Sequence, residues 1–290
     1  MKGFFTVSSM SLMMFAPVIF TSSFASAAGM PAGSAVPMDK ATEAKIRKYV
    51  GQMLIIGFRG YELKPEDTIV RDIQKNNLGG VILFDYDAIP KQYVRNIQSP
   101  EQLLRLTDQL RALTKEKLFI SVDQEGGLVQ RLKPRWGFTG FPSHQDVAIE
   151  RKTNPNAVYD MSQNMAHVLR QYGFNLNFAP VTDVNINPLN PVIGKVKRSY
   201  SADPMEVAAM NEEFIRGHRA EKVLTSIKHF PGHGSSLSDS HLGFTDVTET
   251  WTNKELIPYQ QLLKNDSVDT VMVSHVFNRK IDDKFPATLS

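Results

Sequence analysis

Six short, nearly continuous apolar runs recur along the chain after Ala41, and longer segments with helical spacing separate them. A strand that is covered on both faces reads as apolar throughout, so these runs predict the strands of a parallel sheet. The alternation of strand and helix predicts an α/β architecture with right-handed crossovers. The six runs are Met53–Phe58, Gly80–Phe84, Leu118–Val122, Leu176–Val181, Leu224–Ile227 and Thr270–Val273.

The segments between the runs carry the residues that start and stop helices. Ser99, Asp203 and Thr252 each stand three residues before Glu or Gln, which is the pattern of a helix-capping box. Between Val158 and Tyr172, apolar residues recur at helical spacing until a glycine ends the pattern. These segments predict helices that cover the sheet.

Polar side chains follow several of the apolar runs. In a (β/α)₈ barrel the carboxyl ends of the strands converge on one face, where active sites are built. In an open doubly wound sheet they would line a crevice, but the chain has neither G-x-G-x-x-G nor a P-loop to hold a nucleotide there. The residues at these ends are Asp123, Gln124, Glu125, Asp183, Lys228, His229, Ser274 and His275.

The segment from Ser226 to His241 is the densest in titratable side chains, and this density points to an active site. A metal-dependent hydrolase is one reading, because histidines and an aspartate could bind zinc. Their spacing matches no metal signature, so we expect no metal and no cofactor. The ligands that this alternative would use are His229, His233, Asp239 and His241.

The first 27 residues differ from the rest. Lys2 is their only charge, residues 12–20 are apolar, and Ala25–Ala27 forms an A-x-A cleavage site, so residues 1–27 predict a signal peptide. We therefore expect an exported protein, periplasmic or secreted, with no transmembrane segment in the mature chain. Residues 28–40 read as a linker, and residues 41–290 as the barrel domain.

Composition narrows the possible partners and chemistry. The chain has a formal net charge of +3 with no long basic run, so we expect no nucleic-acid partner. It has no cysteine, which excludes disulfides, thiolate zinc sites and a cysteine nucleophile. Only six strand units are visible, and we expect a barrel that is truncated after the sixth strand and lacks about two further units.

Several motifs together resemble those of glycoside hydrolase family 3, and within it the β-N-acetylglucosaminidases that use a histidine as acid/base. They occur in family order from about Val50 to the end of the chain. The resemblance implies a TIM barrel and retaining hydrolysis of β-linked N-acetylglucosamine. The motifs are Val122–Gly127 with Gln130-Arg131, Phe178–Val184, Arg198–Tyr200, Lys228–Gly234, Asp239–His241, Met272–Val276 and Phe285–Ser290.

The resemblance also implies roles for individual residues. The acid/base falls on His241, with Asp239 as the residue that orients it. The family's nucleophilic aspartate lies on the loop after strand seven, beyond the end of this chain, so the 290 residues alone are expected to be inactive. Leu128 stands where the family often has arginine. The implied sugar-binding residues are Asp123, Arg131, Arg198, Lys228 and His229.

These residue types suit the chemistry. A histidine that has given up its proton is neutral, so it adds no second negative charge beside the nucleophile, and its ordinary pKa lies near working pH. Asp239 can fix the tautomer of His241 from two residues away, and the Gly232–Ser238 segment is expected to let this pair move.

Other reactive side chains have structural interpretations. We expect His233 to pack within its loop, Glu125 to bind backbone in the Gly126-Gly127 turn, and Asp183 with Asn185 to hold the barrel mouth together. His275 is either a satisfied strand-end histidine or part of the site.

The expected substrate is a muropeptide or a chitooligosaccharide. The alternative from another class is a non-catalytic exported protein that binds sugar or peptidoglycan. A carboxylate such as Asp282 or Asp283 is the remaining candidate for a nucleophile within the chain.

Overall fold

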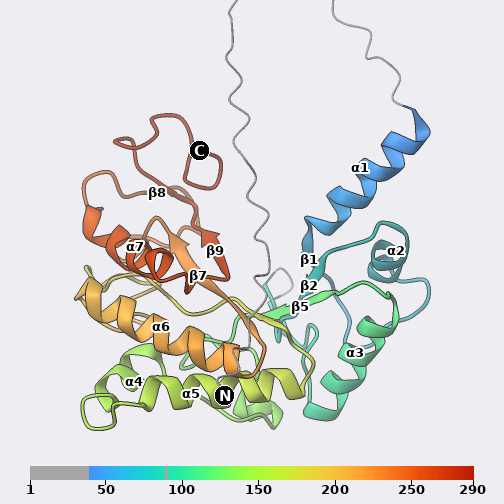
Figure 1. Cartoon of the computed structure of the whole chain (residues 1–290), viewed down its shortest axis with the longest axis horizontal. Helices are drawn as coiled ribbons and strands as arrows, with labels where there is room; N and C mark the ends of the chain where they lie inside the picture. The colour runs from blue at the N-terminus through green and yellow to red at the C-terminus, as the bar shows by residue number, and fades with distance from the viewer. Residues whose placement is uncertain (1–38, 89–90) are drawn as a thin grey trace, which may run out of the picture.

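The computed structural model describes residues 39–88 and 91–290, and its centre is one curved parallel sheet of six strands (Figure 1). Each strand pairs in parallel with its neighbours in the order β1-β2-β5-β6-β7-β9. All six predicted runs supply a strand, which confirms the α/β prediction. The strands are β1 Ile55–Gly57, β2 Gly80–Ile82, β5 Phe119–Val122, β6 Leu176–Asn177, β7 Leu224–Phe230 and β9 Thr270–Val273.

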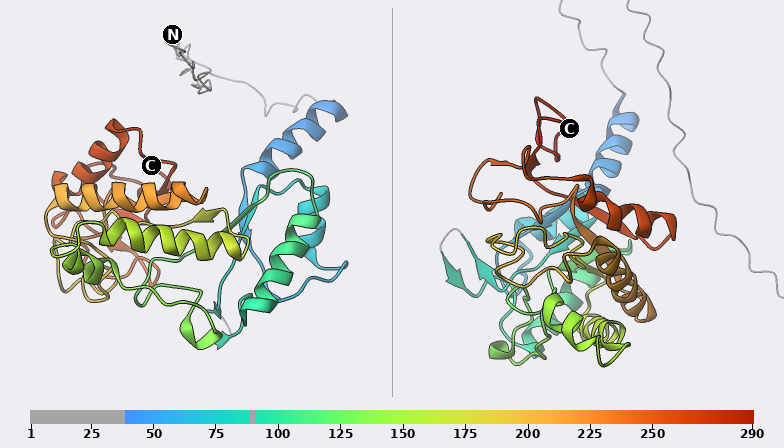
Figure 2. Two further views of the ribbon diagram at one scale, coloured as in Figure 1. Left: turned by 60° about the horizontal axis from the view of Figure 1, so that its bottom comes forward. Right: turned by 90° about the vertical axis from the view of Figure 1, so that its left-hand side faces the viewer.

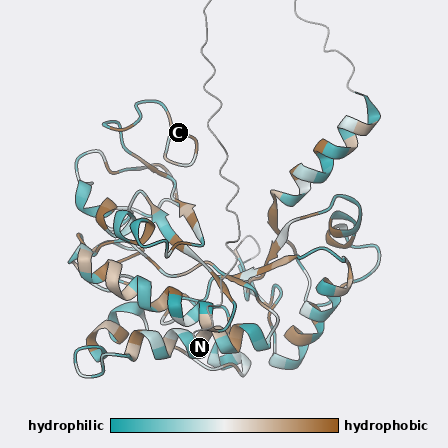
Figure 3. Ribbon diagram, viewed as in Figure 1, coloured by the Kyte–Doolittle hydropathy of each residue, from teal (hydrophilic) through white to brown (hydrophobic). Residues whose placement is uncertain are grey.

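Most helices pack along the outer side of the sheet, where α5, α6 and α7 lie together and α2 and α3 lie near β1, β2 and β5, whereas α1 projects away from it (Figures 1 and 2). The strands are largely hydrophobic, whereas the helices mix apolar and polar residues along their length (Figure 3). The helices are α1 Lys40–Gln52, α2 Thr68–Lys75, α3 Pro100–Ala112, α4 His144–Glu150, α5 Ala157–Gln171, α6 Pro204–Ala220 and α7 Ile257–Lys264, with 3₁₀ turns η1 Pro134–Trp136 and η2 Asn253–Leu256.

Two of the three predicted helix starts are confirmed by their caps. The Ser99 hydroxyl accepts a hydrogen bond from the backbone N–H of Gln102 at 3.2 Å, and the Asp203 carboxylate accepts one from Met205 at 2.8 Å. The third was wrong, because Thr252 makes no side-chain cap and precedes the 3₁₀ turn η2 instead of an α-helix.

The main core fills the space between the sheet and the helices. Its α5 members Val158, Met161, Met165 and Leu169 are the predicted apolar positions, and all are buried. Gly173 then ends the helix with φ +85°, a conformation that favours glycine. The helical stripe is therefore core, as the spacing predicts.

Sheet curvature gives the half-barrel shape that the (β/α)₈ prediction implies. Within residues 39–88 and 91–290, β1 pairs only with β2, and β9 pairs only with β7. Side chains on these outer strands are partly open to solvent, with Ile55 36% exposed and Val271 40% exposed. The sheet thus has two parallel edges that no described strand covers.

Two short pairings lie outside the main sheet. β3 Tyr86–Asp87 and β4 Gln92–Tyr93 form an antiparallel hairpin after β2. β8 Thr245–Asp246 pairs in parallel with β10 Val276–Phe277. The second pairing joins the loop after β7 to the loop after β9, both at the carboxyl end of the sheet.

The start of the chain needs one correction. The predicted linker 28–40 ends too late, because Asp39 caps α1 and Lys40 begins it. The predicted signal peptide and the rest of the linker lie outside the described residues. In the part of the chain that the structure describes, no helix is long and apolar enough to cross a membrane.

Candidate active site

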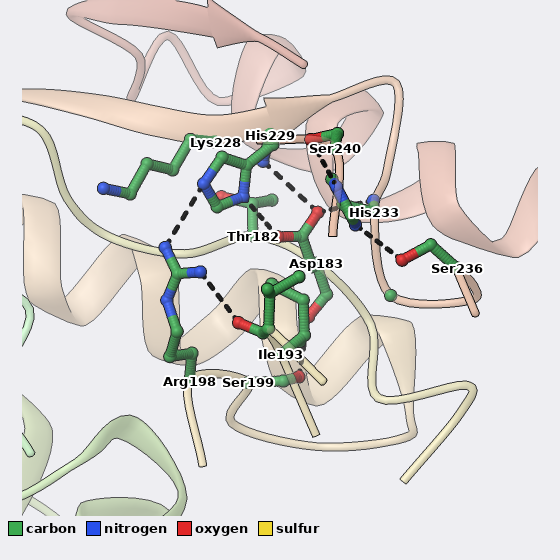
Figure 4. A network of polar contacts seen from close by, with 12 residues as sticks. Thr182, Asp183, Ile193, Arg198, Ser199, Lys228, His229, His233, Ser236 and Ser240 are labelled. Carbon is green, nitrogen blue, oxygen red and sulfur yellow. Dashed lines mark hydrogen bonds and ion pairs between the residues drawn. The ribbon is translucent and has the colours of Figure 1, made fainter. Parts of the chain in front are cut away.

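The candidate site lies at the carboxyl ends of β5, β6 and β7. Figure 4 shows its part around β7, where side chains of this strand meet those of the connection after β6 and of the loop after β7. Lys228 and His229 were expected just after a strand, but they lie within β7, because its pairing with β9 continues as far as Phe230. Asp123 follows β5 directly, and Arg198 comes from the long connection between β6 and α6. Parallel pairing therefore brings together residues that are 105 positions apart.

Lys228 is the buried centre of the site. Its side chain is 3% exposed, and its Nζ lies 2.9 Å from Asp123 Oδ1 and 2.7 Å from Glu125 Oε1. Burial acts to raise the pKa of both carboxyl groups, but the cations beside them outweigh it and hold each pKa below its usual value. Both carboxylates are therefore ionised at neutral pH.

Arg198 makes the second contact with Glu125. Its Nε donates to Oε2 at 2.7 Å and its NH2 donates to Oε1 at 2.8 Å, while NH1 donates to the carbonyl of Val192 at 2.8 Å. This two-point pairing fixes the plane of the guanidinium as well as its position. Glu125, expected to bind the glycine turn, instead joins the two buried cations of the site.

His229 is held in one tautomer by its neighbours. Its Nδ1 lies 2.6 Å from Asp183 Oδ2, and its Nε2 lies 3.3 Å from Arg198 NH2. Arg198 can only donate, so Nε2 accepts and the proton is on Nδ1. Burial lowers the pKa of His229 to about 4, so the ring is neutral at pH 7.

Asp183 belongs to this network rather than to the barrel mouth in general. Its Oδ1 accepts hydrogen bonds from the backbone N–H groups of His229 and His233, at 3.2 and 2.8 Å. Burial would raise its pKa, but the interaction with His229 and these N–H donors keep it lowered. Asn185 does not share this role: its Oδ1 is buried without a hydrogen-bond partner.

The cluster is balanced in charge and only partly open. Arg131 NH2 lies 3.4 Å from Asp123 Oδ2, so three cations face three carboxylates, counting Asp183. Asp123 is 16% exposed and Arg131 is 24% exposed, whereas Lys228 and Glu125 are almost closed off. An incoming hydroxyl group would therefore meet Asp123 and Arg131 first, in positions already fixed by the buried pairs.

Asp239 and His241 form a pair on the loop after β7. Asp239 Oδ1 accepts from the His241 backbone N–H at 2.9 Å and lies 2.8 Å from His241 Nδ1. Burial would raise the pKa of Asp239, but these two bonds from His241 lower it. The carboxylate therefore fixes the proton on Nδ1, and among the described residues no protein atom is hydrogen-bonded to His241 Nε2.

His241 reaches the same cavity as the buried network. The cavity has a volume of about 70 Å³ and is open to solvent, and the side chain of His241 is 74% exposed at its edge. Two larger hollows, of about 560 and 760 Å³, lie at the amino ends of β5 and β7 and beside α1, and neither contains any of the predicted site residues. The small cavity is lined by Val192, Ile193, Arg198, His229, His233, Ser240, His241, Met272, Val273, Ser274 and His275.

Two histidines of β7 and the loop after it have both ring nitrogens in hydrogen bonds within the protein. His229 uses both ring nitrogens on Asp183 and Arg198, and His233 uses both on serine hydroxyls. Among residues 39–88 and 91–290, no group of three or more His, Asp or Glu side chains is arranged to hold a metal ion. Of the four side chains that the zinc alternative requires, His229 and His233 are engaged through both ring nitrogens, Asp239 binds His241 Nδ1, and His241 Nε2 has no hydrogen-bond partner among the described residues.

The sequence-predicted residues thus fall into two connected groups. The predicted sugar-binding residues form the buried network, and Asp239 pairs with His241, which lines a cavity together with Arg198 and His229 of that network. Sequence reasoning missed the parts that Glu125 and Asp183 play. The available signal was that both carboxylates closely follow a predicted apolar run, Leu118–Val122 for Glu125 and Leu176–Val181 for Asp183.

Known proteins are similar to this chain over most of its length. The family model described as glycosyl hydrolase family 3 N terminal domain matches residues 45–290. The beta-hexosaminidase of Stenotrophomonas maltophilia (strain R551-3) is 34% identical over 232 residues, which cover 77% of this chain and 64% of that protein. The beta-hexosaminidase of Alkalilimnicola ehrlichii is 35% identical, covering 82% of this chain and 65% of that protein.

Solved structures also superpose on most of this chain. A family 3 beta-N-acetylglucosaminidase from Paenibacillus sp. str. FPU-7 superposes with a TM-score of 0.73 at 34% identity, covering 84% of this chain and 45% of that chain. NagZ from Neisseria gonorrhoeae, in complex with N-trifluoroacetyl-D-glucosamine, superposes with a TM-score of 0.70 at 29% identity, covering 82% and 67%. The chain thus spans about two thirds or less of the length of these relatives.

Proposed function

Because the chain belongs to glycosyl hydrolase family 3, we propose that it carries the substrate pocket and the acid/base of a retaining β-N-acetylhexosaminidase. The similarity to proteins named beta-hexosaminidase supports this substrate class. The observation on which the proposal mainly rests is the bond of 2.8 Å between Asp239 and His241, at the edge of a cavity that His229 and Arg198 also line.

In this proposal His241 moves the proton. Asp239 holds Nδ1–H, which leaves Nε2 to donate a proton to the glycosidic oxygen as the bond to the leaving group breaks. The neutral ring then takes a proton from the water that releases the sugar. Asp239 also stabilises the ring while it is charged.

Asp123, Arg131, Arg198, Lys228 and His229 would bind the terminal sugar. The carboxylate of Asp123 accepts hydroxyl groups, and the guanidinium of Arg131 donates to sugar oxygens. Lys228 and Arg198 are each fixed by Glu125, so binding would order few side chains.

Retaining hydrolysis also needs a nucleophile. The resemblance assigns it to an aspartate on the loop after a seventh strand, and the six strands of this chain come before that loop. Asp282 is a poor substitute, because its carboxylate already accepts from Ser290 Oγ and from two backbone N–H groups. We therefore expect turnover from a protein that includes the seventh-strand loop, and none from the 290 residues alone.

The natural substrate and its location follow as further proposals. The signal-peptide pattern of residues 1–27 favours export, and outside the cytoplasm the available β-linked N-acetylglucosamine is in peptidoglycan fragments and chitooligosaccharides. Turnover of peptidoglycan is one role that is consistent with both export and this substrate class.

The test is hydrolysis of 4-nitrophenyl N-acetyl-β-glucosaminide by the chain extended through the seventh-strand loop. Replacing the acid/base, His241→Ala, should lower kcat by about 10²- to 10⁴-fold. The matched control is His167→Ala, since His167 is also an exposed histidine paired with a carboxylate, Glu221, but lies on α5. Equal rates for the two variants would show that His241 is not the acid/base.

The same protein tests the non-catalytic alternative. If the chain only binds sugar, the extended protein should bind N-acetylglucosamine, and Asp123→Ala should weaken binding, but no variant should show turnover. Calorimetry of binding beside the rate assay separates the two functions.

A further inference from the structure

His233 connects the Asp239–His241 pair to the body of the protein. Its side chain is buried, its Nδ1 lies 2.7 Å from Ser236 Oγ, and its Nε2 lies 3.0 Å from Ser240 Oγ (Figure 4). Ser240 is the residue between Asp239 and His241. The sequence suggests only that His233 packs within its loop, so this pair of contacts is new information from the structure.

The backbone around His233 is fixed on several sides. Its N–H donates to Asp183 Oδ1 at 2.8 Å, and its carbonyl accepts from Asn190 Nδ2 at 2.7 Å. A Cβ on the neighbouring Gly234 would lie 1.8 Å from the carbonyl oxygen of Val184, so the two backbones are in direct contact. His233 is therefore a rigid attachment point.

The loop beyond it is open to solvent. Residues 231–236 are buried, but Leu237 is 72% exposed and Leu242 is 87% exposed. The expected flexibility of Gly232–Ser238 can thus apply only from Leu237 onward. Among the described residues, the bond between Ser240 and His233 is the one hydrogen bond that joins the tripeptide Asp239–His241 to a residue outside the segment Asp239–Leu242.

We propose that His233 is a positioning residue for the proton-transfer pair, and that its bond to Ser240 holds Asp239 and His241 at the edge of the substrate cavity. This inference rests on the proposed function. Without the bond, His241 would sample positions away from Arg198 and His229, and fewer of its conformations could reach the glycosidic oxygen.

Both partners of His233 are hydroxyl groups, which can donate or accept. Either neutral tautomer of His233 therefore satisfies both contacts, and a charged ring can donate to both. Positioning by His233 should accordingly be independent of pH, whereas proton transfer by His241 should not be.

The test compares Ser240→Ala, which removes the hydroxyl, with Ser240→Thr, which keeps it. The control is Ser238→Ala, because the Ser238 hydroxyl lies in the same loop but pairs with Thr245 Oγ1 at 3.0 Å. Limited chymotrypsin digestion of the full 290-residue chain, read by mass spectrometry, measures cleavage after Leu242 and Phe244. The extended protein supplies kcat, KM and the pH profile.

Loss of one hydrogen bond should make Ser240→Ala about 2- to 10-fold more sensitive to cleavage and lower its kcat by a similar factor. KM and the pH profile should be unchanged, and Ser240→Thr should stay within about twofold of the parent. Equal cleavage of the parent and Ser240→Ala, equal effects of Ser240→Ala and Ser238→Ala, or a normal or raised kcat in Ser240→Ala would overturn the proposal. An extended protein without any turnover would refute the proposed function, and the cleavage rates would still decide whether His233 holds the loop.

Discussion

Glu255 should make the stability of this protein fall as pH rises toward neutrality. It lies in η2 beneath the loop after β7 and is fully buried, and its Oε2 accepts from the backbone N–H of Gly234 at 2.8 Å. Burial raises the pKa of Glu255 to about 7, and the nearby charge of Asp183 adds to this effect. Hydrogen bonds from the side chain and backbone of Ser235 and from the backbone of Gly234 act to lower its pKa.

The sign and size of this change in stability follow from the difference in proton binding between the folded and unfolded states. The pKa of Glu255 is 4.5 when unperturbed and about 7 in the folded chain, so between these values the folded state binds the proton more strongly than the unfolded state. The free energy of unfolding therefore decreases as pH rises through this range, and the decrease stops above pH 7. A pKa difference of this size corresponds to a loss of roughly 3 kcal/mol in the free energy of unfolding.

The variant Glu255→Gln isolates this contribution. Glutamine cannot ionise, and its carbonyl can still accept from Gly234. In urea unfolding from pH 4.5 to 8, the variant should gain roughly 3 kcal/mol relative to the parent across the range. Glu249→Gln is the control, since this side chain is 82% exposed, and it should gain nothing. A constant difference between Glu255→Gln and the parent at every pH would refute the reasoning.

Two further predictions concern the same region. Arg198→Lys keeps the charge but loses the paired contact with Glu125. In urea titration it should lower the free energy of unfolding by about 1–3 kcal/mol, and in calorimetry it should weaken sugar binding. Unchanged values in both assays would contradict the role of the guanidinium plane. Gly234→Ala places a methyl group 1.8 Å from the carbonyl oxygen of Val184 and should cost at least about 3 kcal/mol in the same titration, so a variant as stable as the parent would show that this loop can shift.

Much of the fold could be predicted because its signals are local. Apolar runs such as Leu118–Val122 are visible in any parallel sheet, and caps such as Ser99 act within four residues. The error at Thr252 arises because the signal is only local: a capping box does not distinguish an α-helix from a 3₁₀ turn. Here the 3₁₀ turn carries Glu255, which binds the backbone of Gly234 in the loop after β7.

The site was harder to predict because it depends on distant contacts. Asp123 and Lys228 could be predicted to meet, since strand ends converge in a parallel sheet. The role of Glu125 could not, because its place in a glycine turn suggests local bonds, and only the register of β5, β6 and β7 brings it to Lys228 and Arg198.

The structure divides the site into a rigid part and an exposed part, and the proposed chemistry needs both. The proposed sugar-binding residues are largely buried and paired, so binding one ring would require little reorganisation of them. The proton must instead travel between a leaving oxygen and water, which requires a group that solvent can reach. His241 meets that requirement on an exposed loop, and a loop has too few contacts of its own to keep a side chain in place. A buried histidine bonded to the neighbouring serine resolves this conflict, because it fixes the loop without closing His241 off from water.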